Sequence, residues 1–121
     1  MREIKFRAWD TVLSKFFDGD ILNDYNLGDF LNDDRYIVTQ YTGLKDINGV
    51  EIYEGDILRV WVTKTINFVA MVDCLNGTFG IGSIPSGYGY HHKFSSFHNN
   101  VGTRYEVIGN IYENKELLEG E

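Results

Sequence analysis

The stretch that decides the fold is YTGLKDINGVEIYEGD, residues 41–56. Asn48-Gly49 predicts a tight turn, because both residue types tolerate a positive φ. Gly55 predicts a second turn, and an aspartate in such a setting accepts hydrogen bonds from nearby backbone N–H groups. We therefore expect a structural turn motif, made up of Gly43, Asp46, Asn48, Gly49, Glu54, Gly55 and Asp56.

Strand patterns flank this motif on both sides. Residues 4–9 alternate between apolar and polar, which predicts a half-buried strand, and residues 15–17 would return as the second strand of a hairpin. Residues 35–41 are rich in β-branched and aromatic side chains, as strands are. Further strands are predicted at 57–63, 66–72, 78–81 and 105–112, with a turn at Asn76-Gly77 and a short helix at 115–118 capped by Asn114.

Two stretches show no regular spacing of apolar residues. Residues 18–34 combine Gly, Asn and Asp with a few apolar residues, which predicts a loop with one helical turn. Residues 82–102 are dense in Gly, Ser, Asn and Tyr, which predicts a long loop.

Many short strands separated by Gly-bearing turns predict a mainly β fold. At this size we expect a small SH3-like antiparallel barrel with an appended N-terminal hairpin and a short C-terminal helix. The expected division is an N-terminal hairpin plus acidic loop over 1–35 and the barrel over 36–121, or one compact domain over 1–121.

The composition limits the classes of protein to which the chain can belong. The chain has 121 residues, 43% of them hydrophobic, which is enough for the core of one domain. The single cysteine, Cys74, excludes an intrachain disulfide, and the opening MREIKFRAWD lacks the apolar run of a signal peptide. No stretch approaches the ~20 apolar residues of a membrane helix. We therefore expect a cytoplasmic protein that does not bind membranes.

The net charge of −7 is unevenly distributed. Residues 18–34 hold six Asp and no Lys or Arg, and residues 106–121 hold five Glu and one Lys. Residues 57–105 contain four Lys or Arg residues and one acidic residue, Asp73. The acidic total argues against a broadly basic nucleic-acid coat, whereas the acidic stretch at 18–34 could engage a basic partner.

Three segments together resemble the YopX family of phage and prophage proteins. They are MREIKFRAWD at residues 1–10, QYTGLKD with NG and EIYEGDI within residues 40–57, and YEVIGNIYE at residues 105–113. The resemblance implies a small, mostly β protein of a phage or prophage, located in the cytoplasm of the host bacterial cell. It implies no catalytic residue, because the family has no assigned biochemical activity.

Metal and catalytic chemistry find little support in the sequence. His91, His92, His98 and Cys74 lack the paired spacing of structural zinc ligands. Asp18-Gly-Asp20 lacks the order of an EF-hand loop. Because no nucleophile elbow, Walker loop or HExxH motif is present, we expect no enzyme activity, no metal and no cofactor.

Two binding functions remain. Tyr-rich surfaces suit protein contacts, so a protein-interaction or self-assembling module, with a host or phage protein or a second copy as partner, is the first prediction. The alternative is a barrel that binds single-stranded nucleic acid, since a basic, aromatic surface would suit stacking. The residues expected to bind in either case are Arg59, Trp61, Lys64, Tyr88, Tyr90, His91, His92 and Lys93.

Overall fold

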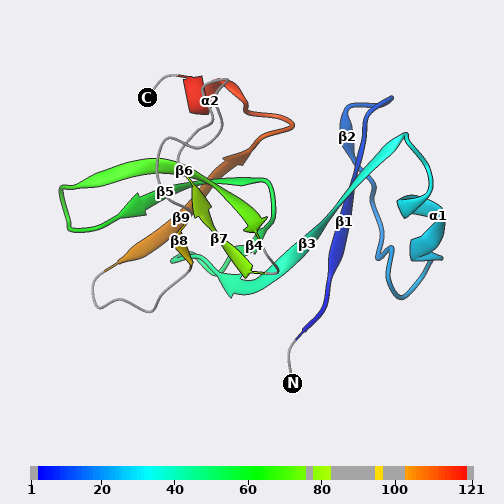
Figure 1. Ribbon diagram of the computed structural model, residues 1–121, viewed down its shortest axis with the longest axis horizontal. Coiled ribbons are helices and arrows are strands. Elements are labelled where there is room, and N and C mark those ends of the chain that lie inside the picture. The colour runs from blue at the N-terminus through cyan, green and yellow to red at the C-terminus, as the bar shows by residue number, and fades with distance from the viewer. Residues whose placement is uncertain (1–2, 76–77, 83–94, 97–102, 120–121) are drawn as a thin grey trace.

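The computed structural model describes residues 3–75, 78–82, 95–96 and 103–119 (Figure 1). In chain order the elements are β1 (Phe6–Asp10), β2 (Lys15–Phe16), α1 (Leu27–Leu31), β3 (Tyr36–Lys45), β4 (Glu51–Tyr53), β5 (Asp56–Trp61), β6 (Asn67–Leu75), β7 (Thr78–Gly82), β8 (Ser95–Ser96), β9 (Arg104–Asn110) and α2 (Glu116–Glu119). No helix in these ranges is long and apolar enough to cross a membrane.

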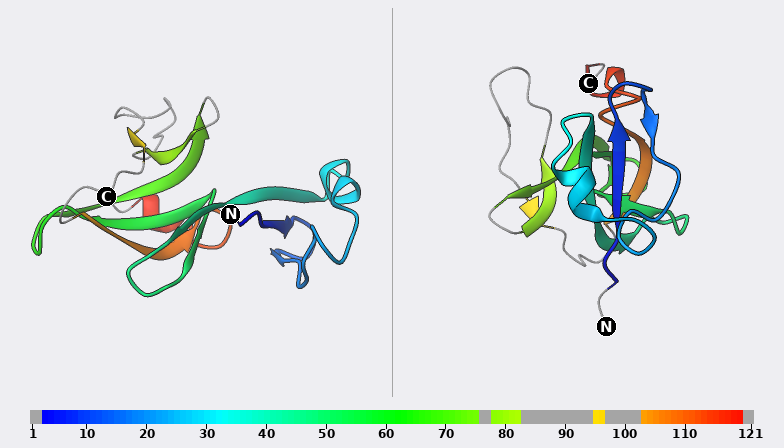
Figure 2. Two further views of the ribbon diagram at one scale, coloured as in Figure 1. Left: turned by 90° about the horizontal axis from the view of Figure 1, so that it is seen from below. Right: turned by 90° about the vertical axis from the view of Figure 1, so that its right-hand side faces the viewer.

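The strands form two antiparallel sheets. One has the order β2-β1-β3-β4 and the other the order β8-β7-β6-β5-β9. Strand β3 pairs with two strands in turn. Its residues 36–40 pair with β1, and Tyr41 and Lys45 pair with β4, with a register shift between these two residues. Figure 2 shows the five-stranded sheet curled into a half-barrel, with β3 extending from it toward α1.

Three apolar cores hold these elements together. The first lies inside the half-barrel and is built from alternate residues of β5 and β6 with Ile52 and Ile81. The second belongs to the N-terminal sheet, where Ala8, Ile21 and Phe30 are packed by neighbouring aromatic rings. The third joins the outer face of the half-barrel to α2. The strand residues of each core follow from period-two alternation, which places every second side chain on one face; Ile21, Phe30 and Leu118 join them from a turn and the two helices.

The predicted mainly β fold with an N-terminal hairpin and a short C-terminal helix is confirmed. The part predicted as a small SH3-like antiparallel barrel is a half-barrel of antiparallel, curled strands. The third predicted strand is longer than expected, because it continues past Tyr41 to Lys45. The predicted loop at 82–102 contains strand β8, which pairs Ser95 and Ser96 with β7. Backbone pairing of this kind needs no apolar alternation, so the sequence pattern does not reveal it. The predicted turn at 76–77 lies outside the described residues.

Two local predictions are wrong. Strand β1 is not half-buried, since Ala8 packs into the N-terminal core while Trp9, on the opposite face, is also buried. The opposite face is covered because Trp9 stacks on Tyr112 beside the half-barrel, with ring centroids 5.5 Å apart. Asn114 does not cap the C-terminal helix with its side chain, which instead accepts a hydrogen bond from the backbone N–H of Asn110.

Candidate functional site

The turn motif is organised around the Asp46 carboxylate. Its Oδ1 accepts hydrogen bonds from the N–H groups of Asn48 and Val50 at 2.8 and 2.9 Å. Its Oδ2 accepts from the N–H of Val107 at 2.9 Å, on the edge strand β9. Burial alone would raise the pKa of Asp46, but these three N–H groups together lower it. Asp46 therefore ties the β3–β4 turn to the half-barrel.

Glycines set the backbone of this motif. Gly43, Gly49 and Gly55 have φ values of 89°, 82° and 90°, in the region that side chains with a Cβ disfavour. At Gly49 a Cβ would meet no atom within 4 Å, whereas at Gly55 it would lie 3.2 Å from the Tyr112 ring. Gly55 is thus required for both its conformation and the close approach of Tyr112, and Gly49 for its conformation alone.

Asp56, the last residue of the motif, makes a buried ion pair with Arg7 of β1. Arg7 Nη2 lies 2.7 Å from Asp56 Oδ1, and the Asp56 side chain is 3% exposed. The second carboxylate oxygen accepts from the N–H of Tyr53 at 2.7 Å. Burial raises the pKa of Asp56 against the opposing effect of the Arg7 charge. Nothing in the sequence pattern identifies Arg7 as this partner, because the two residues are 49 positions apart.

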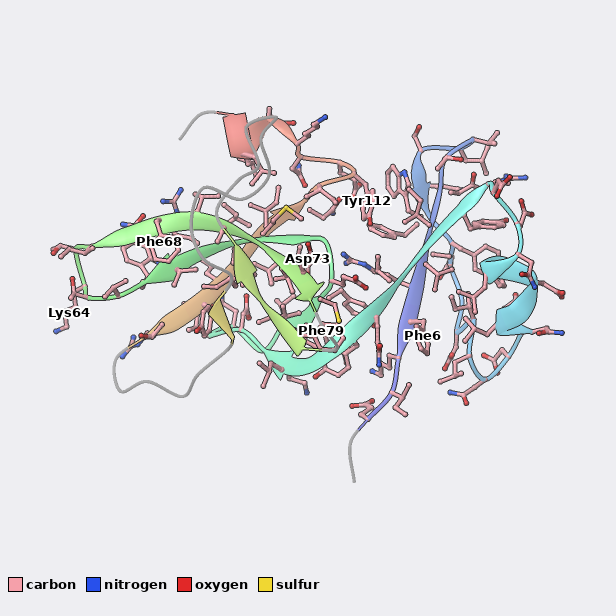
Figure 3. The ribbon with its side chains drawn as sticks, in the orientation of Figure 1. Phe6, Lys64, Phe68, Asp73, Phe79 and Tyr112 are labelled. Atoms are coloured by element: carbon pink, nitrogen blue, oxygen red, sulfur yellow. The ribbon has the colours of Figure 1, made fainter. Side chains whose placement is uncertain are left out.

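Aromatic rings enclose the same ion pair. The Arg7 guanidinium carbon lies 4.5 Å from the centroid of Phe16 and 4.6 Å from that of Tyr53. Trp9 packs edge to face on Phe16 and stacks on Tyr112. Figure 3 shows Tyr112 between the half-barrel and the N-terminal sheet. The ion pair and its rings therefore form a junction that fixes the N-terminal sheet to the half-barrel.

Three of the predicted binding residues gather at one end of the half-barrel. Arg59 and Trp61 lie on the same face of β5, and Arg59 Nη1 donates to Asn67 Oδ1 at 2.5 Å. Lys64 is exposed in the turn that follows β5. Tyr88, Tyr90, His91, His92 and Lys93 lie outside the described residues.

An apolar surface adjoins these residues. Val62, Ile66 and Phe68 continue the apolar alternation of the half-barrel core but are 45%, 60% and 41% exposed. The sequence predicts their shared face but not where the core stops, which is at Val60 and Ala70. Figure 3 shows Lys64 and Phe68 toward this extremity of the molecule. We name this extremity the hairpin end. Val62, Ile66 and Phe68 lie on its inner face, Trp61 and Arg104 lie on its outer face, and Lys64 lies in the turn.

The other prominent surface is the acidic lobe, residues 18–34. Its six aspartates are all exposed, and Tyr25 and Leu31 among them are 50% and 61% exposed. The lobe is ordered by its own hydrogen bonds: Asp20 accepts from the N–H groups of Leu22 and Asn23, and Asn26 caps α1. Arg35, the cation that follows the lobe, is held by Asp10 through two hydrogen bonds of 2.9 and 2.7 Å.

The potential metal ligands in the described part of the chain lie apart from one another. Within it, no three His, Cys, Asp or Glu side chains gather closely enough to hold a metal ion. Cys74 is a half-buried free thiol there, whereas His91, His92 and His98 fall outside the described ranges.

This architecture is similar to that of two solved structures. A solved structure of protein EF1440 from Enterococcus faecalis is similar, with 28% identity, a TM-score of 0.60, and coverage of 98% of this chain and 99% of that one. Protein yopX from Bacillus subtilis is similar at 17% identity, with the same TM-score and coverages. No curated protein matches the chain. The sequence model of the family described as YopX protein matches residues 21–119, most of the chain, and the chain therefore belongs to the YopX family.

Proposed function

We propose that this chain is a non-enzymatic protein-interaction module that works in the cytoplasm of a bacterium carrying a phage or prophage. The observation that carries the proposal is the acidic lobe, which exposes six aspartates together with the side chains of Tyr25 and Leu31. Such a surface is complementary to a protein that presents cations and apolar groups together. Nucleic acid would be repelled from it, because its phosphates carry the same sign of charge.

The lobe is also suited to binding because its shape is set before a partner arrives. Phe30 and Ile21 anchor it in the N-terminal core, and Phe17 packs edge to face on both Tyr25 and Phe30. A preorganised surface loses less conformational freedom on binding than a flexible loop does.

The test is affinity purification from host cells with tagged full-length protein. Neutralising three lobe acids in Asp24→Asn/Asp29→Asn/Asp34→Asn should abolish capture of a specific protein partner. The matched control, Glu113→Gln/Glu116→Gln/Glu119→Gln, changes the net charge equally at the other end of the sequence and should keep the partner. Capture that is equal in both variants would contradict the role of the lobe.

The alternative function, binding of single-stranded nucleic acid, has one observation in its favour. Arg59 and Trp61 share a face of β5, and Arg104 is the register neighbour of Trp61 on β9. This alternative predicts salt-sensitive binding to a mixed oligonucleotide pool, lost in Arg59→Ala or Trp61→Ala. Absence of binding at low salt would eliminate it.

A further inference from the structure

The Asn48-Gly49 pair lies at the tip of the β3–β4 hairpin, and both residues are exposed. Asparagine is a heat-labile residue, and a following glycine favours its deamidation, because no side chain hinders attack by the glycine nitrogen. The space around Gly49 is also open, since a Cβ at this position would meet no atom within 4 Å. The pair therefore has the sequence and the exposure that deamidation requires.

Deamidation at this pair needs no reactant other than water. The Gly49 nitrogen loses its proton and attacks Cγ of Asn48, and the side-chain amide leaves as ammonia, which gives a five-membered succinimide. Water then opens this ring at one of its two carbonyl groups. One opening gives aspartate at residue 48. The other gives isoaspartate, in which the main chain runs through Cβ and Cγ and is one carbon longer.

The folded turn opposes the first step of this reaction. The N–H of Gly49 donates a hydrogen bond to the carbonyl of Asp46 at 3.0 Å. The N–H groups on either side, those of Asn48 and Val50, donate to Oδ1 of Asp46 at 2.8 and 2.9 Å. To attack, the Gly49 nitrogen must lose the proton that it donates to Asp46 and turn toward the side chain of Asn48. Deamidation therefore requires local opening of the turn.

Isoaspartate at residue 48 would in turn disturb the contacts of Asp46. The added carbon would lie between the N–H groups of residues 48 and 50, both of which Oδ1 of Asp46 accepts in the unmodified chain. This oxygen could not keep both contacts at their present lengths. The other oxygen, Oδ2, accepts from the N–H of Val107 on β9. A displaced Asp46 would thus weaken the attachment of the β3–β4 hairpin to the half-barrel.

We propose that Asn48 is a deamidation site that the hydrogen bonds to Asp46 protect, and that its conversion to isoaspartate weakens the attachment of the β3–β4 hairpin to β9. Asp46 is the positioning residue, because it holds the N–H groups around the reacting bond. The proposal concerns this hairpin and not the acidic lobe, so it holds whether or not the lobe binds a protein.

Mass spectrometry of the tryptic peptide 46–59 measures the reaction, because Asn48 is the only asparagine or glutamine in that peptide. Purified full-length protein is incubated at neutral pH beside the synthetic peptide 46–59. The folded protein should deamidate about tenfold more slowly than the peptide, or more slowly still, because only the open turn reacts. Asp46→Ala should react about tenfold or more faster than the wild type. Equal rates in the folded wild type and the peptide would overturn the protection by the turn.

Leu118→Ala is the matched control for loss of overall stability. Leu118 packs on Ile57 and Val69 and not on residues of the turn, so its truncation destabilises the core without removing a contact of Asp46. Deamidation at residue 48 should stay within about twofold of the wild type in this variant. Equal acceleration in Asp46→Ala and Leu118→Ala would overturn local opening in favour of unfolding of the whole chain. If Asp46→Ala melts below the incubation temperature, Asp46→Ser, which retains a weaker acceptor, replaces it and should react at an intermediate rate.

The isoaspartate form, separated from aged protein by ion-exchange chromatography, tests the effect on stability. All proteins in this arm carry Asn76→Ser, which removes the second Asn-Gly pair of the sequence. The control Asn48→Asp has the charge of the isoaspartate form but a main chain of normal length. The isoaspartate form should unfold at a lower urea concentration than Asn48→Asp. Equal midpoints would overturn the weakened attachment, and unreacted Asn48 in Asp46→Ala after the peptide has reacted completely would overturn the site itself.

Discussion

The ion pair between Arg7 and Asp56 should supply much of the free energy that attaches the N-terminal sheet to the half-barrel. The carboxylate is 3% exposed, and Arg7 Nη2 lies 2.7 Å from it. In Arg7→Met the carboxylate would keep the N–H of Tyr53 but lose the guanidinium. Removing one member of a buried ion pair costs about 3–5 kcal/mol. We expect the lower end, about 3 kcal/mol, because one hydrogen bond and part of the ring contact remain.

The reverse change should cost less. In Asp56→Asn, Arg7 keeps its hydrogen bonds to Thr39 Oγ1 and the carbonyl of Glu54, and it keeps its contacts with two rings. We expect a loss of about 1–2 kcal/mol, the range for a weakened hydrogen bond. In the double variant the losses should not add, and a coupling of about 1–3 kcal/mol should appear.

Urea unfolding of the four proteins gives this cycle, and its pH dependence gives a second check. Burial raises the pKa of Asp56 in the folded chain, and loss of Arg7 should raise that pKa further. A carboxyl with a higher pKa in the folded than in the unfolded chain stabilises the fold as pH falls. The cost of Arg7→Met should therefore shrink from neutral toward acidic pH. A cost below about 1 kcal/mol, or additive losses, would refute the reasoning and assign the junction to its aromatic rings.

Three further outcomes are expected. Gly49→Ala should lower the free energy of unfolding by about 1 kcal/mol, because the residue has a positive φ. Gly55→Ala should lower it further, because its Cβ would also lie 3.2 Å from the Tyr112 ring. Equal losses in urea unfolding would contradict the role of Tyr112. Asp46→Ala should cost about 2–3 kcal/mol because three N–H groups lose their acceptor, and Asp46→Asn should fall between it and the wild type. The Arg35 guanidinium lowers the pKa of Asp10 from 3.8 to about 2, so the stabilisation by Asp10 is complete above the unfolded pKa and is lost as pH falls through the folded one. Melting temperatures between about pH 5 and pH 2 should fall less steeply in Asp10→Asn, and parallel curves would argue against this pair.

Local patterns predicted most of the strands but not their partners. Alternation at residues 57–63 and 66–72 indicates which side chains share a face, and this is what β5 and β6 show. Alternation carries no information on how far a neighbouring element covers the face. For this reason the pattern did not reveal that Phe68 is exposed while Ala70 is buried.

The composition of the candidate surfaces can also be predicted from the sequence, but their spatial arrangement cannot. The acidic composition of residues 18–34 can be read directly, whereas the rigidity of the lobe depends on Phe30 packing among rings from β3 and the preceding loop. At the hairpin end, Arg104 lies beside Trp61, 43 positions earlier in the chain, only because β5 pairs with β9.

The sequence by itself determined the mainly β class, the glycine-dependent turns and the uneven charge, because each depends on residues near one another in the chain. Only the tertiary structure decided the junction and the arrangement of surfaces. The Arg7–Asp56 ion pair joins residues 49 positions apart, and its strength comes from burial that no local pattern specifies. The opposed positions of the acidic lobe and the hairpin end follow from β3, which runs through the middle of the molecule and belongs with both parts (Figure 1).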